Sequence, residues 1–462
     1  MNAEIKSKIM IKNRPAGAVP LLIVILLLIL IRFVSAQETN SAPSPIDLAT
    51  TLKLAGAQNL DVAIARERVK EAQAQHEQAR MQFLPWLAPG IGYRRHEGNI
   101  QDVSGNVFNA DKQSFTAGAA LNAQVDVGDA IYKTLAARQV VRAAEAGAET
   151  QRQQTLATAA AGYFELARAK AACVATREAV RISEDYLAQV QQAVAVGIAF
   201  KGDAYRAEVQ MQKNRMLERS AEEQQAVASA RLAQTLRLDA TTRLNPDATE
   251  LVPLVWVETN ATLSALLARA LQARPELKQG AALVAAGKAV RKGAQYGPLV
   301  PTLGAQANWY SLSGGKNSDW SGADDGRDYF VGLNWRVGPG GLFDRGRIRA
   351  ATARETVSSL ELDKSRDEII RQVIESKTRA DSLSDQVAMA QRALAAAQEV
   401  WKLSVERKSF GLGAVLETVQ AEQDLTRARL DFLARVAEHN QVQFQLLRTL
   451  GEMEALDALS KF

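Results

Sequence analysis

The chain has 462 residues, enough for two or three ordinary domains, and its many alanines and glutamines with only 6% aromatic residues favour long helices. Its formal net charge is +5. Five basic residues against one acidic residue in positions 1–36 account for +4 of that charge, which excludes a nucleic-acid-binding protein with a strongly basic surface. A single cysteine, Cys173, excludes an intrachain disulfide.

Residues 1–36 have the pattern of a secretory signal peptide. A basic start precedes an apolar run from Ala16 to Ile31, and Val34-Ser35-Ala36 forms a small-residue cleavage site. The alternative is an uncleaved anchor, although the run is short for a full membrane span. No later apolar run is long enough for a transmembrane helix. We therefore expect an exported protein that is not a helical membrane protein.

The first half of the mature chain predicts a helix followed by a strand. Residues 46–82 have a helical pattern, which Pro85 ends, and a Gly- and Asn-rich stretch then runs to about residue 114. Residues 115–127 alternate between apolar and polar side chains. This alternation predicts a strand with one apolar face. A weaker alternation starts at Leu87.

The second half repeats this order. A helix is stopped by Pro298 and Pro301, and two alternating segments (303–309 and 329–337) flank a Gly- and Ser-rich loop. We expect two hairpins with strands of about 10–12 residues, which suits tilted transmembrane strands.

A very long helical run follows each hairpin. The first, from Asp129 to Val196, could reach about 100 Å. It carries a heptad seam that returns 214 residues later, which indicates coiled-coil packing and an internal duplication. Cys173 lies on this seam, so we expect it to be buried, without a redox role. The two seams are Leu166, Ala169, Cys173, Thr176, Val180, Ser183, Leu187, Val190 and Ala380, Leu383, Val387, Ala390, Leu394, Ala397, Trp401, Ser404.

Glycines end both long helices and predict turns. Gly197 follows the last apolar position of the first run, and Asp203 is placed to cap a helix that descends to about Leu238. In the second copy Gly411 and Gly413 make the turn, and Glu417 falls in the first turn of a helix to about residue 450.

These elements define a mainly α-helical chain with a transmembrane β part. The predicted organisation is a signal peptide (1–36), a first repeat (37–240), a packed connector (241–274) and a second repeat (275–462). Four strands have open edges, which lipid does not tolerate, so several copies must close one barrel. The aromatic residues near the strands suit interfacial girdles better than ordinary strand composition: Trp86, Tyr93, Phe108, Trp309, Tyr310, Trp320 and Trp335.

The order and spacing of several short phrases make the mature chain resemble the TolC family of outer-membrane efflux channels. The resemblance implies a homotrimer with a 12-stranded β-barrel in outer-membrane lipid and a 12-helix α-barrel in the periplasm. It also implies docking on a periplasmic adaptor coupled to an inner-membrane pump. The phrases are Leu84-Pro85-Trp86, Val300-Pro301-Thr302, Gly332-Leu333-Asn334-Trp335, Leu342-Phe343-Asp344-Arg345-Gly346, Val196-Gly197-Ile198 and Phe410-Gly411-Leu412.

The implied function is a passive export conduit of a tripartite efflux or type I secretion system, and not an enzyme. His76, His96 and His439 lack the spacing of metal ligands, and no cofactor is expected. A periplasmic adaptor is the main alternative, because adaptors also use helical hairpins, and a coiled-coil adhesin is a third. The duplicated strand and helix order argues against both.

By the resemblance, acids at the start of the descending helices narrow the periplasmic mouth, and Asp203 and Glu417 match them. Three carboxylates around an axis make a negative ring that favours cations. The alternative is stabilisation of a helix N-terminus, which we favour for Asp203, whereas we favour the ring for Glu417. Two positions depart from the family pattern: Gln420 replaces a second acid, and Gly413 lacks a basic side chain.

The helix tips are also apolar, which predicts a docking surface for the adaptor's own helical hairpin. The alternative is packing within the turns themselves. The predicted docking residues are Val196, Gly197, Ile198, Phe410, Gly411 and Leu412.

Overall fold

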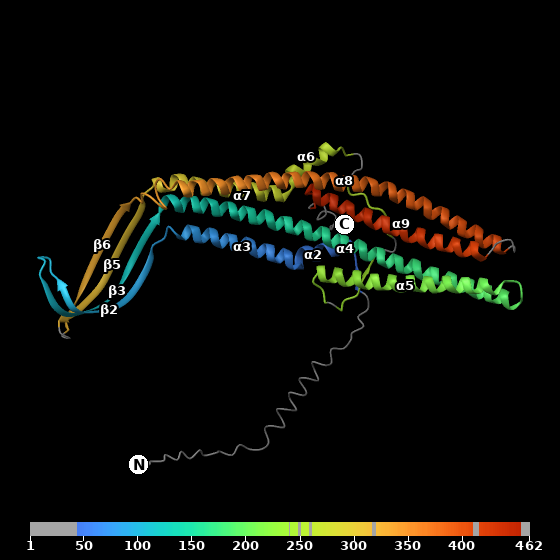
Figure 1. Ribbon diagram of the computed structural model, residues 1–462, viewed down its shortest axis with the longest axis horizontal. Helices are drawn as coiled ribbons and strands as arrows, with labels where there is room; N and C mark the ends of the chain where they lie inside the picture. The colour runs from blue at the N-terminus through green and yellow to red at the C-terminus, as the bar shows by residue number, and fades with distance from the viewer. Residues whose placement is uncertain are drawn as a thin grey trace, which may run out of the picture.

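A computed structural model shows an elongated molecule with a β-sheet at one end and two long helical hairpins at the other (Figure 1). The predicted signal peptide lies outside the described residues, and so do three of the predicted docking residues, Phe410, Gly411 and Leu412. The structure describes residues 44–239, 241–247, 251–257, 261–316, 320–409 and 415–453.

The sheet has four antiparallel strands in the order β2-β3-β5-β6. They span Trp86–Gln101, Val107–Asp126, Thr302–Lys316 and Ser321–Asn334. The strands contain 16, 20, 15 and 14 residues, so the prediction of 10–12 was too short. Pairing continues through the Gly- and Asn-rich stretch as far as Gln101 and Val107, because the register there is unbroken. The outer strands, β2 and β6, leave two open edges.

Aromatic side chains lie at both ends of this sheet. Trp86 opens β2 and Trp335 follows β6, both beside the helices, whereas Tyr93, midway along β2, contacts Trp320, just before β6, with ring centroids 6.2 Å apart. Trp86 and Tyr93 are seven positions apart on one strand, about 23 Å at ~3.3 Å per residue. At a strand tilt of ~40° the two residues are about 18 Å apart across the membrane, which is less than the apolar band of ~25 Å. The two levels of aromatic side chains nevertheless suit interfacial girdles.

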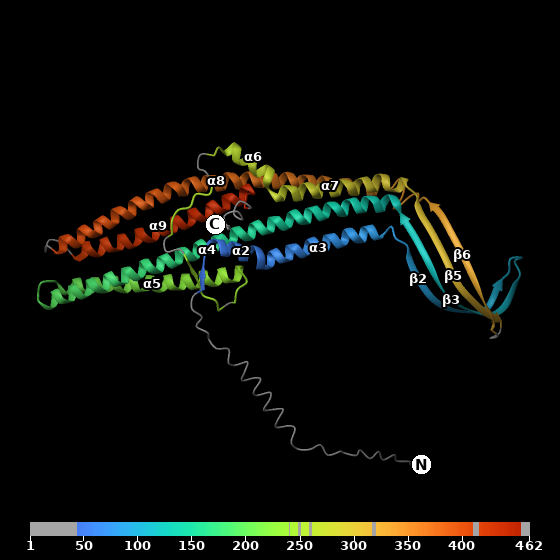
Figure 2. The same cartoon turned by 180° about the vertical axis from the view of Figure 1, so that it is seen from behind.

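Each repeat contributes one long helix that leaves the sheet. Helix α4 (Val127–Ala195) has 69 residues and reaches about 100 Å, as predicted, and it pairs with α5 (Lys201–Thr235). Helix α8 (Arg345–Ser409) pairs with α9 (Val415–Leu450). Figures 1 and 2 show the two hairpins lying alongside each other, away from the sheet. None of the helices in the described part of the chain is both long and apolar enough to cross a membrane.

Shorter helices flank the sheet-side halves of the long ones. Helix α7 (Pro275–Tyr296) lies against α4 and α8. The predicted single helix over residues 46–82 is instead two, α2 (Leu48–Gln58) and α3 (Leu60–Met81). Asn59 adopts an extended conformation between them, and its side-chain oxygen accepts a hydrogen bond from the Asp61 amide at 2.8 Å. This caps α3, so an N-cap replaces the predicted continuous helix.

The core lies at the waist of the molecule, where both repeats meet the connector. Helix α6 (Leu263–Ala273) packs here, and the short strands β1 (Ser44–Ile46) and β4 (Leu244–Pro246) pair in parallel. Ile46 therefore belongs to a strand and not to the predicted helix. All but one residue of the first predicted seam, including Cys173, are buried. Of the second seam only half the positions are buried in the protomer, namely Ala380, Leu383, Val387 and Ser404. The first seam thus packs as the sequence predicts, and the second does so over half of its positions.

The two repeats pack closely against each other where their long helices leave the sheet. A Cβ on Gly128 would lie 2.2 Å from the Gly297 carbonyl oxygen, so only glycine fits there. The Arg347 guanidinium donates to both carboxylate oxygens of Asp129 at 2.7 Å. This ion pair fixes the start of α4 against the start of α8.

Candidate functional site

The turn that joins α4 to α5 is a regular helix-terminating motif. The Gly197 amide donates to the Val194 carbonyl at 3.0 Å, and the Ile198 amide donates to the Ala193 carbonyl at 2.8 Å. This pair of bonds defines a Schellman motif, whose central residue needs a left-handed backbone. Gly197 has that backbone, with φ of +79°. The predicted turn is confirmed.

The same turn leaves three large apolar side chains uncovered by the rest of the protomer. Val196 is 69% exposed, Ile198 82% and Phe200 74%. Their backbone conformation is set by the Schellman bonds and by the start of α5. Exposed apolar groups gathered at one place indicate an interaction surface.

Asp203 does not cap α5. The N-cap residue is Phe200, which makes no side-chain capping bond, and Asp203 lies inside the first turn. Its carboxylate accepts a hydrogen bond from the Arg206 guanidinium at 3.1 Å. The capping prediction is wrong because α5 starts two residues before Asp203. The Asp203 carboxylate is still favourably placed, because a negative charge in the first turn of a helix interacts well with the helix dipole.

Glu417 lies in the first turn of α9, as predicted, and has its own arginine partner. The Arg407 guanidinium, near the end of α8, donates to the Glu417 carboxylate at 2.7 Å. Each of the two predicted constriction acids is therefore paired within its own hairpin. Both ion pairs are partly solvent-exposed, so each carboxylate still carries charge toward water.

A groove of about 500 Å³ runs between the two hairpins just behind the tips. Tyr186 of α4 contributes to it and donates its hydroxyl to the Val415 carbonyl at 3.3 Å, which ties the first residue of α9 to the first hairpin. Trp401 and Val405 of α8 form the other side. The sequence placed Trp401 on the seam but did not predict this groove, because the pairing of the hairpins is not encoded in either seam alone.

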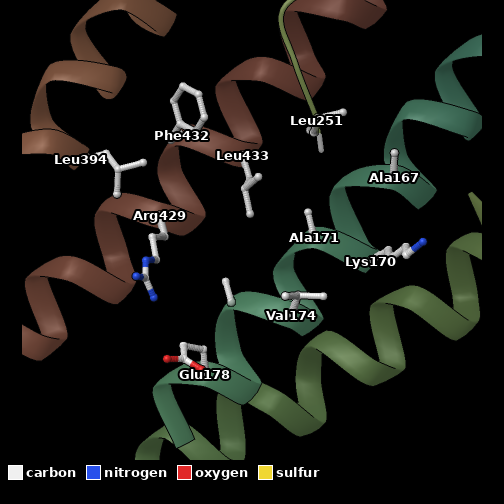
Figure 3. A pocket seen from close by; sticks show the side chains of 11 residues that line it. Ala167, Lys170, Ala171, Val174, Glu178, Leu251, Leu394, Arg429, Phe432 and Leu433 are labelled. Atoms are coloured by element: carbon white, nitrogen blue, oxygen red, sulfur yellow. The ribbon is translucent and has the colours of Figure 1, made fainter. Parts of the chain in front are cut away.

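A second groove, of about 400 Å³, lies between the hairpins nearer the waist. Figure 3 shows it between α4 and α9, with Leu251 of the connector closing one end. Val174 and Leu433 contribute apolar surface, while Glu178 and Arg429 lie at the opposite end. The hairpins are thus separated by grooves at two levels along their length.

Between these grooves, a buried polar network joins the hairpins. The Glu422 carboxylate of α9 accepts hydrogen bonds from Gln210 at 2.9 Å and Asn214 at 3.0 Å, both on α5. Thr426 donates to it at 3.0 Å from the next turn of α9. Burial raises the pKa of Glu422, and the hydrogen bonds offset this only in part. The sequence signal was available, because polar residues interrupt the buried face of α9, but we did not predict the network.

The chain combines a four-stranded sheet with open edges and two long helical hairpins that arise from a duplication. This combination is typical of membrane channels whose β-barrel continues into a helical tunnel. The sequence profile described as outer membrane efflux protein matches residues 51–236 and 266–452. These two matches cover both repeats and most of the chain. The chain therefore belongs to the outer membrane efflux protein family.

Solved structures share this fold over nearly the whole chain. A membrane protein from Pseudomonas aeruginosa has a TM-score of 0.75 at 20% identity, with 87% of this chain and 93% of that chain covered. The CmeC outer membrane channel of Campylobacter jejuni has a TM-score of 0.75 at 14% identity, with coverages of 90% and 89%. The MtrE outer membrane channel of Neisseria gonorrhoeae, in its open state, has a TM-score of 0.69 at 17% identity, with coverages of 87% and 88%. No curated protein matches the chain by sequence.

Family membership establishes the function in outline. The chain is an outer-membrane efflux channel that extends into the periplasm, and it is a passive conduit and not an enzyme. Channels of this family are trimers that work with periplasmic adaptors and inner-membrane pumps. The adaptor alternative gains no support.

Proposed function

We propose that this efflux channel receives its periplasmic adaptor at the ends of its helical hairpins. The observation that carries the proposal is the exposure of Val196, Ile198 and Phe200 on a turn whose backbone is fixed. Isolated exposed apolar residues are ordinary, but three on one rigid turn favour burial against a partner. Gly197 provides the turn, and Phe410, Gly411 and Leu412 are the equivalent positions of the second hairpin.

The groove behind the tips supports a helical partner. It lies beside the exposed turn, and its walls come from three helices, α4, α8 and α9. An amphipathic helix places apolar side chains into such a groove at helical spacing. A helical hairpin of the adaptor would therefore contact the turn with its end and the groove with its side.

We also propose that Asp203 and Glu417 form the constriction of the tunnel. Three copies of each acid around a trimer axis would give a ring of carboxylates that favours cations. The pairing with Arg206 and Arg407 lowers the net charge of that ring. The ring would therefore select weakly.

The sheet supports an assembly in outer-membrane lipid. Strands β2 and β6 have unpaired edges, and in lipid such edges must pair. Pairing β2 of one protomer with β6 of the next closes a barrel of three sheets. Nucleic acid has no part in this proposal.

The docking proposal is tested with Ile198→Asp, which places a charge on the exposed turn. We expect co-purification with the adaptor of the same pump to weaken at least about tenfold, since burying an isoleucine contributes about 1.5–3 kcal/mol. Val103→Asp is the matched control, because Val103 is fully exposed at the other end of the molecule. Unchanged adaptor binding by a trimeric Ile198→Asp channel would contradict the proposal.

A further inference from the structure

Basic side chains lie opposite one another across three strands, at the end of the sheet that is far from the helices (Figure 1). Strand pairing places His96 of β2 opposite Lys112 of β3, and Lys112 opposite Lys316 of β5. Directly opposite residues share a face of the sheet and have Cβ atoms about 4.5–5.5 Å apart. Arg94, two residues before His96 on β2, lies on the same face. We call these four residues the basic row.

Within the part of the chain that the structure describes, no acidic side chain pairs with the basic row. Like charges that face each other across strands destabilise a sheet. On β6, the register places Asp324 opposite Leu312, which is about 13 Å along β5 from Lys316 at ~3.3 Å per residue. Arg94, Lys112 and Lys316 are exposed, so their charges are available to a ligand. The other described residues next to the row on this face are uncharged, namely Gly98, Ala110, Ser114 and Gly314.

The opposite face of the same strands has a different character. Arg95 of β2 points to that face, and its guanidinium pairs with Asp111 at 3.1 Å and with Glu97 at 2.5 Å. Toward the helices this face carries exposed apolar side chains such as Ile91 and Leu121. The apolar band of a transmembrane barrel faces lipid, so the basic row faces the lumen. Adjacent positions of β2 therefore differ, because Arg95 has two acidic partners whereas no described acid pairs with the basic row.

The ring of His96 supplies a second, independent observation. Its Nε2 is shielded from solvent and has no hydrogen-bond partner among the described residues. Buried polar atoms in proteins are nearly all hydrogen-bonded, so an atom of this kind indicates a partner that comes from outside the chain. The side chain directly opposite, Lys112, carries only donors when charged. An anion bound here would offer acceptors to both side chains.

We propose that the basic row is a binding site for multivalent anions of the phosphate class, at the outer end of the channel's lumen. Arg94, Lys112 and Lys316 bind the phosphate oxygens, and His96 donates a hydrogen bond from its ring. A bound anion offsets the repulsion between the facing cations, so it is held more strongly than by isolated surface lysines. The trimer repeats the row around its axis.

The spacing of the basic row favours linked phosphates over a single phosphate. His96 and Lys316 are separated by two strand spacings, about 10 Å. A chain of linked phosphates reaches across this distance, whereas one phosphate contacts only neighbouring members of the row. Lipid headgroups lie against the other face of the sheet, so the ligand is a soluble anion. The row would concentrate such anions at the exit of the channel.

The test measures the binding of sodium triphosphate by isothermal titration calorimetry. The full-length channel is studied as a trimer in nanodiscs of zwitterionic phosphatidylcholine, at about 0.1 M salt, so that anionic lipid does not compete. We expect saturable binding to the parent. A channel with both Lys112→Gln and Lys316→Gln should bind at least about tenfold more weakly, because each change removes a charge-assisted contact. A channel with both Lys112→Arg and Lys316→Arg should keep the binding, because guanidinium groups also bind phosphate.

The opposite face supplies the matched control. Arg95→Gln removes a positive charge from the same strand but outside the basic row, and this channel should bind triphosphate like the parent. The net charge of each subunit changes by one, so the control separates the row from general electrostatic attraction.

Three results would overturn the proposal. One is the lack of saturable binding by the parent channel, which requires no variant to fold. Another is equal affinity of the parent and the double glutamine channel. The third is a loss of affinity in Arg95→Gln as large as that in the double glutamine channel. The basic row lies at the opposite end of the molecule from Ile198, and no adaptor is present, so this proposal and the docking proposal fail independently.

Discussion

The two helical hairpins share one plan but differ where they touch. Both have a long ascending helix and a descending helix, and the two descending helices are of about the same length. Yet Glu208 of the first is exposed, whereas the equivalent Glu422 of the second is buried, and Asn214 corresponds to Ala428. The duplicated seam builds each hairpin, and the unequal polar residues then join one hairpin to the other. Equivalent positions in a duplicated chain therefore need not have equivalent roles.

The largest effect is expected from Asn214→Ala. This variant gives the first repeat the alanine that the second repeat has at the equivalent position, Ala428. The variant leaves the buried Glu422 without one of its donors, which should cost about 2–3 kcal/mol of unfolding free energy. Denaturant unfolding followed by helical circular dichroism measures the change. Lys213→Ala, at the adjacent exposed position, should have almost no effect. Equal stability of the Asn214 and Lys213 variants would show that the network contributes nothing.

A smaller effect is expected at the first turn. Gly197→Ala forces a side chain into a left-handed backbone and should cost about 1–2 kcal/mol, whereas Gly56→Ala, inside α2, should gain up to about 1 kcal/mol. The same unfolding experiment compares the two. Gly411→Ala extends the comparison to the second turn: a similar loss would indicate the same geometry there, and no loss would indicate a different turn.

The smallest effect concerns the two acids. Glu417→Gln should lower the ratio of cation to anion permeability by up to about fivefold, because partly exposed charges contribute about 1 kcal/mol or less. Asp203→Asn should change it less, since its carboxylate is the less exposed of the two. Reversal potentials in planar bilayers under a salt gradient measure both. A larger change of the permeability ratio in Asp203→Asn than in Glu417→Gln would contradict the view that Glu417 contributes more to the charged ring.

Much of the fold could be predicted from the sequence because it depends on periodic patterns. The heptad seams, the turn at Gly197 and the two strand pairs each follow from local spacing. The strand lengths could not be predicted from local spacing. Strands β2 and β3 continue through glycine and asparagine residues, where pairing with the neighbouring strand keeps the backbone extended. The break at Asn59 was missed because a helical pattern continues on both sides of it.

The site was less predictable, for a physical reason. Asp203 was expected to cap a helix, but one turn of difference in the helix start changes an N-cap into an interior position. Glu422 and Gln210 are 212 residues apart, and their contact depends on how two separately built hairpins lie together. Neither seam contains that information.

The parallel pair of β1 and β4 has a practical consequence for labelling the protein. Residues 44–46 are fixed at the waist, about halfway between the sheet and the hairpin tips, as Figure 2 shows. Any epitope or fluorophore attached just before Ser44 would therefore start its path at the middle of the periplasmic part. An antibody against such a tag would recognise the channel from the periplasm, and intact cells would remain unlabelled.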